Sequence, residues 1–272
     1  GNNFYIVKAK LHFKNQFVTF YFMKRYRSYK SNNMKKYVFF LVASCFCLHF
    51  ANAQNVVYDA NAQVRKVGNF NGIDVSNGIV LYLSQGSTQA VAVSADDAKY
   101  VDKIITKVEN GVLQIKVESG VWNGFSWGNK KLKAYVTCTE LTSLGVSGGS
   151  IAKIQDMLKV GNISVDASGG SIVEGNIQGT SMKAEFSGGS ISKLSGSIDQ
   201  LKIELSGGSI FKDYALSVNS CSIDASGGSI ANLTVNKDLR AEGSGGSIIY
   251  YKGSANITSV DTSGGSIIKK KD

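Results

Sequence analysis

The chain has 272 residues and a formal net charge of +10. Residues 1–53 hold nine Lys or Arg and no Asp or Glu, so the other 219 residues, with 21 basic and 20 acidic side chains, are nearly neutral. This distribution gives no reason to expect a nucleic-acid partner. Both histidines, His12 and His49, also precede residue 54, which excludes His-dependent triads and the usual zinc sites from the rest. We expect no cofactor and no metal.

The basic N-terminal region has the pattern of an export signal. Residues 1–33 are interpreted as an upstream or extended leader without a structural role, and residues 34–53 as a signal peptide. A basic start at Met34-Lys35-Lys36 precedes a short apolar run, and Ala51-Asn52-Ala53 is typical of a cleavage site. The pattern predicts a periplasmic, outer-membrane-surface or extracellular protein. An alternative is a lipoprotein modified at Cys45, which follows Val42-Ala43-Ser44.

Residues 54–140 predict a β-rich N-terminal part with one short helix. The stretches GIDVS, GIVLYLS, QAVAVSA, GVLQIKVES and KLKAYVTC alternate or run apolar between Gly, Asn and Ser, as strands do. Residues 94–104 suit a short helix with Ser94 as N-cap. From residue 54 onward no segment is long and apolar enough to predict a membrane span.

An aromatic segment, residues 120–131, lies between two of these strands and holds both tryptophans of the chain. Trp122, Phe125 and Trp127 stand among Gly and Asn, which is typical of a loop. Such rings could stack on sugars or contact a partner protein, and they are the candidate ligand-binding residues. The alternative is that they cover an open end or a flank of the fold.

The second half, residues 141–272, repeats one pentapeptide seven times. The motif Ser-Gly-Gly-Ser-Ile, here the SGGSI box, begins at Ser147, Ser168, Ser187, Ser206, Ser226, Ser244 and Ser263, at intervals of 18 to 21 residues. A period near twenty predicts a solenoid. A flexible Gly/Ser linker is excluded because an apolar Ile closes every box, and linkers have no reason to keep one in phase.

Residues before each box alternate in character, as in a strand with one wet face. Counted back from the first Ser of the box, positions −3 and −1 are mostly apolar, and position −2 is acidic in six of seven repeats: Asp166, Glu185, Glu204, Asp224, Glu242 and Asp261. The pattern therefore predicts that each coil contains a strand, a Gly-Gly corner and a second strand. A basic residue two positions before three of the acids is expected to supply partners across neighbouring coils.

Stacked coils of 19–20 residues predict an all-β fold, a single-stranded parallel β-helix of about seven clear coils with irregular N-terminal coils. Right-handed winding is favoured by the general handedness of parallel crossovers. At least four coils separate Cys138 from Cys221, or roughly 19 Å at the spacing of neighbouring strands. A disulfide requires Cα atoms within about 7 Å, so two free thiols are expected. Whether residues 54–140 continue the same helix stays open, with continuation favoured.

Three longer motifs resemble a known family. FNGIDVSNGIVLYLSQG at residues 70–86, then VENGVLQIKV, then the repeated SGGS boxes are similar to the “putative auto-transporter adhesin, head GIN domain” family of exported Bacteroidetes proteins. The resemblance covers nearly all of residues 58–272. It implies a β-helical cell-envelope protein and no established reaction or ligand.

The predicted function is that of an exported, non-catalytic envelope or surface protein with an adhesin-like binding role or a structural role. Glycans or envelope proteins are its expected partners. The alternative is a polysaccharide lyase or hydrolase on a β-helix scaffold. Such enzymes use clustered carboxylates, often with Arg or calcium, whereas these acids form a regular column and only Arg65 and Arg240 follow residue 53.

Overall fold

The computed structural model describes residues 59–118 and 131–272. Within them the chain forms strands almost throughout, with one short 3₁₀ helix, η1 (Ala98–Lys103). The strands of the first half are β1 (Gln63–Val64), β2 (Gly72–Val75), β3 (Val80–Gln85), β4 (Ala90–Ser94), β5 (Ile104–Glu109), β6 (Val112–Val117) and β7 (Lys133–Cys138). Those of the second half are β8 (Ser143–Val146), β9 (Ile151–Ala167), β10 (Ile172–Phe186), β11 (Ile191–Leu205), β12 (Ile210–Ala225), β13 (Ile230–Gly243), β14 (Ile248–Lys252), β15 (Asn256–Thr262) and β16 (Ile267–Lys270).

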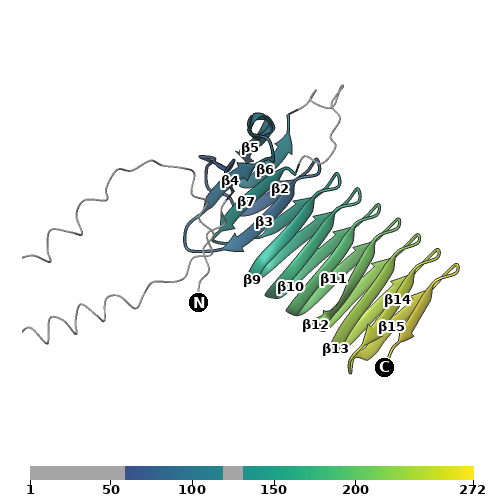
Figure 1. Cartoon of the computed structure of the whole chain (residues 1–272). Coiled ribbons are helices and arrows are strands. Elements are labelled where there is room, and N and C mark those ends of the chain that lie inside the picture. The colour runs from purple at the N-terminus through teal and green to yellow at the C-terminus, as the bar shows by residue number, and fades with distance from the viewer. Residues whose placement is uncertain (1–58, 119–130) are drawn as a thin grey trace, which may run out of the picture.

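The second half is a parallel β-helix, as the repeat predicts. Strands β9 to β13 pair in chain order, each parallel to the next, and β14, β15 and β16 continue the stack. Figure 1 shows these coils lying over one another along one axis, with the loops that carry the boxes in a row. The backbone of each inner coil therefore forms hydrogen bonds with the coil before it and the coil after it. The predicted parallel β-helix is confirmed.

The box forms a tight corner that stacks directly on the corner of the preceding coil. Gly208 donates its backbone N–H to the Gly188 carbonyl at 2.7 Å, and the same bond joins Gly228 to Gly207 and Gly265 to Gly245. The first glycine of each box has a positive φ, +66° at Gly207. Glycine adopts this conformation without the steric cost that a Cβ imposes.

The two glycines of one box are expected to differ in their tolerance of alanine. A Cβ on Gly207 would lie 3.0 Å from the Gly188 carbonyl oxygen at positive φ, whereas one on Gly208 would lie in ordinary contact, 3.5 Å from the same atom. Gly207→Ala should lower the free energy of unfolding by about 1–2 kcal/mol. Gly208→Ala is the matched control and should change it by less than about 0.5 kcal/mol. Urea unfolding of both variants checks this, and equal costs would contradict the corner geometry.

Differences in repeat length are absorbed at the second bend of the coil, away from the box. Between Ser192 and Gly196 in β11 and their partners Phe211 and Leu216 in β12, the later strand holds an extra residue. A similar shift follows Glu174 in β10. The acidic column and its neighbours stay in continuous register because the insertions lie elsewhere.

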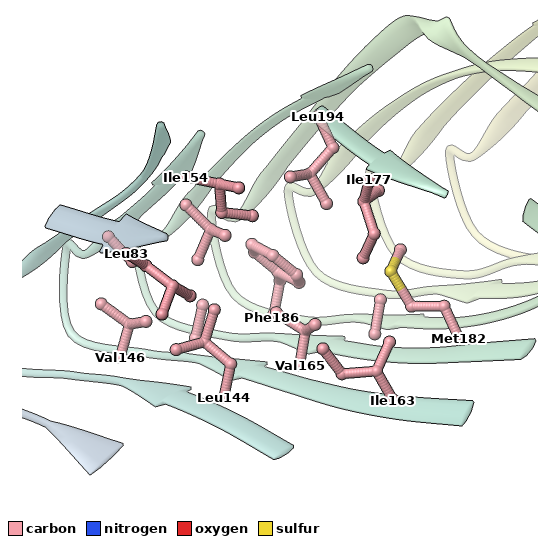
Figure 2. Close-up of a cluster of buried hydrophobic side chains, with 14 of the residues drawn as sticks. Leu83, Leu144, Val146, Ile154, Ile163, Val165, Ile177, Met182, Phe186 and Leu194 are labelled. Atoms are coloured by element: carbon pink, nitrogen blue, oxygen red, sulfur yellow. The ribbon is translucent and has the colours of Figure 1, made fainter. Parts of the chain in front are cut away.

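The core is a column of apolar side chains inside the coils. Positions −3 and −1 are buried in the first six boxed coils, as expected, and Figure 2 shows Val165, Ile163 and Phe186 pointing inward with Leu194 and Ile177 from the opposite side. The last coil has no further coil over it, so its inward position −3, Val260, is 48% exposed. A buried Ile, Leu or Val contributes about 1.5–3 kcal/mol.

The box isoleucines are not part of this core. Ile151, Ile172, Ile191, Ile210, Ile230 and Ile248 are half-buried on the outside, paired in register as a ladder. The second serine of each of these boxes is fully buried instead, as at Ser171, whose hydroxyl donates to the Val146 carbonyl. Because side chains alternate along a strand, placing serine inside at the corner forces the following isoleucine outside.

The first half extends the same stack. β2 pairs in parallel with β8, and β3 pairs in parallel with β9. Residues 76–79, Ser-Asn-Gly-Ile, occupy the place of a box, since Ser147 N–H bonds to the Val75 carbonyl and Ile151 N–H to the Ile79 carbonyl. Strands β6 and β7 form a further layer beyond β2 and β3, and β5 and β4 add antiparallel to them. The favoured continuation of the helix agrees with this pairing.

The expected short helix is present with a different cap. It is the 3₁₀ helix η1, and Asp97, not Ser94, accepts the Lys99 N–H as its N-cap. Ser94 is buried at the end of β4, and its hydroxyl donates to Asp59 Oδ1 at 2.7 Å. Ser94 lies four residues before η1 begins, too early to cap it, and its hydroxyl serves the Asp59 carboxylate instead.

Asp59 fastens the start of the described chain to β4 and β7. Besides Ser94, Tyr135 Oη lies 2.9 Å and Lys133 Nζ 3.1 Å from Asp59 Oδ2. Burial alone raises the pKa of Asp59, but these hydrogen bonds outweigh it and lower that pKa. Both carboxylate oxygens of Asp59 therefore accept hydrogen bonds from β4 and β7, and these bonds attach the start of the described chain to the two strands.

Cys138 and Cys221 are both buried and free, as the spacing predicts. Burial raises the pKa of Cys138 to about 11 and that of Cys221 to about 12. Thiolates are the reactive form of cysteine, so both thiols are expected to be inert.

Candidate functional site

An open groove with a volume of about 660 Å³ runs along the stack beside the box corners. One side carries the acidic column, and the other carries the first serines of the boxes. The carboxylates that line it are Asp74, Asp166, Glu185, Glu204 and Asp224, and the serines are Ser147, Ser168, Ser187, Ser206 and Ser226. The groove therefore repeats one set of polar groups from coil to coil.

The local sequence explains why these groups face outward together. Position −1 turns into the core, so position −2 and the first box serine lie on the outer surface on either side of it. Asp74 pairs with Gly145, Gly145 with Asp166, and the column continues in register through Glu185, Glu204 and Asp224. Five steps at the spacing of neighbouring strands give a length of about 24 Å.

The basic residues of the column pair within their own strand, which corrects the expectation of partners across coils. Lys202 Nζ lies 2.8 Å from Glu204 Oε1, and Lys183–Glu185 and Arg240–Glu242 form the same pair two residues apart. Residues i and i+2 of one strand point to the same outer face, so a lysine and the glutamate two residues after it are neighbours. In the next coil, the residue directly beside Lys183 is another lysine, Lys202, which cannot form an ion pair with it. Such half-exposed pairs stabilise little, about 0–1 kcal/mol each.

The pKa values of two neighbouring carboxyl groups in the groove, Asp166 and Glu185, shift in opposite directions. Burial raises the pKa of Asp166, and the hydrogen bond and negative charge of Glu185 raise it further. For Glu185, the hydrogen bonds from Lys183 and then Asp166 lower the pKa. As the pH falls, the first proton taken up by this pair therefore resides on Asp166, next to an ionised Glu185. The groove offers carboxylate oxygens as acceptors and hydroxyls as donors and acceptors.

The structure brings together residues that the sequence pattern had assigned to separate surfaces. The sequence pattern placed the acidic column on the wet face of a strand and the box serines at the corners, and the register makes them two sides of one groove. The signal was present in the constant offset of two residues between each acid and the following serine. In the described ranges no three His, Cys, Asp or Glu side chains come together as metal ligands would.

The predicted ligand-binding residues Trp122, Phe125 and Trp127 lie outside the described residues. They belong to the segment between β6 and β7, the two strands that pair with β2 and β3. Their role stays a prediction. No helix within residues 59–118 and 131–272 is long and apolar enough to cross a membrane.

Comparison with known proteins identifies relatives of the chain. The model of a family described as “Putative auto-transporter adhesin, head GIN domain” matches residues 69–255, in agreement with the resemblance seen in the sequence. No curated protein matches.

Several solved structures share the fold. A “putative adhesin” from Bacteroides fragilis superposes with a TM-score of 0.71 at 20% identity, over 77% of this chain and 96% of the other. A “putative lipid binding protein” from Parabacteroides distasonis gives 0.59 at 20% identity, over 78% and 96%. A “putative adhesin” from the same organism gives 0.60 at 15% identity, over 77% and 96%. Identities this low show a common fold.

Proposed function

Because the chain belongs to the family described as “Putative auto-transporter adhesin, head GIN domain”, we propose that it is an exported, non-catalytic cell-envelope protein that binds an extended glycan along the acidic groove. The observation that carries the proposal is the groove itself, which presents carboxylates and serine hydroxyls in register over consecutive coils. A lining that repeats every ~4.8 Å suits a ligand that also repeats, as a linear polymer does.

The charge of the groove narrows the class of polymer. Carboxylates accept hydrogen bonds from hydroxyl and ammonium groups, and hydrogen bonds to charged groups are worth about 1.5–3 kcal/mol each. An acidic polysaccharide would meet the like charges of Asp74 and Asp224, which take part in none of the ion pairs found among the described residues, and this disfavours it. A neutral or amino-substituted glycan fits the groove best.

Charge reversal in the groove provides the test. Glu185→Lys with Glu204→Lys should weaken binding to neutral or amino-substituted polysaccharides at least tenfold, since two charged acceptors are lost. Glu109→Lys with Asp238→Lys is the matched control, because these exposed acids lie on β5 and β13 away from the groove. Affinity electrophoresis in gels containing each polysaccharide measures the retardation. Equal retardation of both variants across polysaccharides would exclude the groove as the binding site.

The same preparations separate the alternative function. Release of oligosaccharide from a bound polysaccharide would favour a lyase or hydrolase over a binding protein.

We also propose the aromatic segment as a second contact. Trp122→Ala with Trp127→Ala should then weaken binding on a glycan array, whereas unchanged binding would leave the groove as the contact.

A further inference from the structure

A second charged surface lies on the outer side of the C-terminal coils, in the strand segments that follow the boxes. Outward residues of four neighbouring coils form what we call the basic sheet face. It consists of Ile210, Lys212 and Tyr214 of β12, Ile230, Asn232 and Thr234 of β13, Ile248, Tyr250 and Lys252 of β14, Ile267 and Lys269 of β16, and Lys271 just after β16. Pairing in register aligns Ile210, Ile230, Ile248 and Ile267 in one column, and Tyr250 with Asn232 and Lys269 in the next.

The lysines of this face carry charge that the fold leaves unpaired. Lys183, Lys202 and Arg240 in the acidic column each have a glutamate partner, whereas the nine ion pairs found in the described chain include none of Lys212, Lys252, Lys269 and Lys271. The face itself has no acidic member. Asp213 lies between Lys212 and Tyr214 but points into the core, and Asp272 adjoins the face in sequence.

Aromatic rings stand among these cations. Lys271 Nζ lies 4.2 Å from the centroid of the Tyr250 ring, and Lys252 Nζ lies 5.2 Å from that of Tyr214. Both tyrosines are half-buried, with the isoleucine ladder beside them on the same outward surface. The face therefore combines apolar side chains, tyrosines and lysines on a flat sheet.

We propose that the basic sheet face is a docking surface for an anionic lipid bilayer. A soluble polyanion would use the lysines alone. A bilayer interface also accommodates tyrosine rings at the headgroup level and half-exposed isoleucines at the acyl boundary. Each lysine close to an anionic surface contributes about fivefold to partitioning, and salt weakens this contribution.

Because the acidic column and the basic sheet face lie on different surfaces, the protein would dock on the bilayer in one orientation. The acidic column precedes each box and the basic sheet face follows it, so the two surfaces lie on different sides of the corner. An anionic bilayer attracts one and repels the other. The groove then stays directed away from the lipid, open to a glycan.

Vesicle flotation of the full chain tests the proposal. The vesicles consist of phosphatidylcholine alone or of phosphatidylcholine with an equal amount of phosphatidylglycerol. Lys212→Glu with Lys252→Glu should lower partitioning onto the anionic vesicles at least tenfold. Lys269→Glu with Lys271→Glu is an independent second pair with the same expectation. The matched control, Lys66→Glu with Lys237→Glu, changes two exposed lysines elsewhere and should retain binding. All variants share residues 1–58, so the comparison cancels any contribution of that basic region.

Three results would overturn the proposal. The first is equal partitioning of the face variants and the control. The second is capture of soluble polyglutamate through the same lysines without binding to anionic vesicles. The third is that the lysine variants change only self-association, seen by sedimentation velocity, which would assign the face to a second copy of this chain. Glycan retardation of the face variants should be unchanged, so failure here is distinguishable from failure of the groove.

Discussion

Replacing Phe211 by alanine is expected to lower the free energy of unfolding by about 3–5 kcal/mol. The side chain is fully buried, and its ring meets that of Phe186 edge to face with 5.7 Å between centroids. Phe186 is the last residue of β10, and the box after it leads into β11, the coil that pairs with the strand of Phe211, β12. That coil places a small residue, Ser192, in register with Phe211. Alanine would leave a cavity beside the Phe186 ring that the small side chain of Ser192 cannot fill.

The adjacent Ile210→Ala is the matched control for this prediction. It removes an apolar side chain from the same strand, but one that is half-buried on the outer ladder. Its cost should not exceed about 1 kcal/mol, because little apolar area is lost from the core. Chemical denaturation followed by circular dichroism measures both variants. A cost for Ile210→Ala equal to that of Phe211→Ala would mean that the outer ladder, not the inner column, stabilises the stack.

Replacing Asp213 by asparagine is expected to remove a large part of the pH dependence of stability. The carboxyl group of Asp213 is buried at the second bend of β12, where the strand holds its extra residue. It accepts the Leu194 N–H at 2.8 Å and the Ser192 hydroxyl at 2.5 Å. Because the register of β11 and β12 shifts between Ser192 and Gly196, the Asp213 carboxylate accepts the Leu194 N–H in place of a main-chain carbonyl of β12. Burial raises the pKa of Asp213 to about 7, although these two bonds oppose the rise.

The direction of the effect follows from the raised pKa. Between about pH 4 and pH 7 the folded chain holds a proton on Asp213 that the unfolded chain has released, so stability falls as the pH rises through this window. The stability lost is on the order of 4 kcal/mol at about 1.4 kcal/mol per unit. Above about pH 7 both states are ionised, and this contribution is constant.

An asparagine side chain at this position would stay neutral and can still accept the Leu194 N–H. Asp213→Asn should therefore be more stable than the natural chain at pH 8, by about 2–4 kcal/mol, and similar or slightly less stable at pH 4.5. Asp224→Asn, which removes an exposed carboxylate from the same strand, is the control for the loss of one negative charge. Unfolding curves across this range measure the difference. Parallel profiles for the natural chain and Asp213→Asn would show that Asp213 does not titrate between the two states.

Sequence reasoning reached the architecture because the repeat is periodic. Each coil must bond to its neighbours in the same way, so the spacing of the boxes determines the stack, the inward positions −3 and −1, and the distance that keeps Cys138 and Cys221 apart. It did not show that the box isoleucine lies outside. An apolar residue in phase fits either face, and only the buried serine before it decides between them.

The amino-acid sequence by itself thus determined the parallel β-helix, the acidic column and the separation of the thiols, since these depend on periodicity alone. Only the tertiary structure decided that acids and serines form one groove, that Lys183 pairs with Glu185 in its own strand, and that Asp213 enters the core. These features depend on where side chains point and where an extra residue is absorbed. Local composition does not contain that information, because it arises when one coil packs on the next.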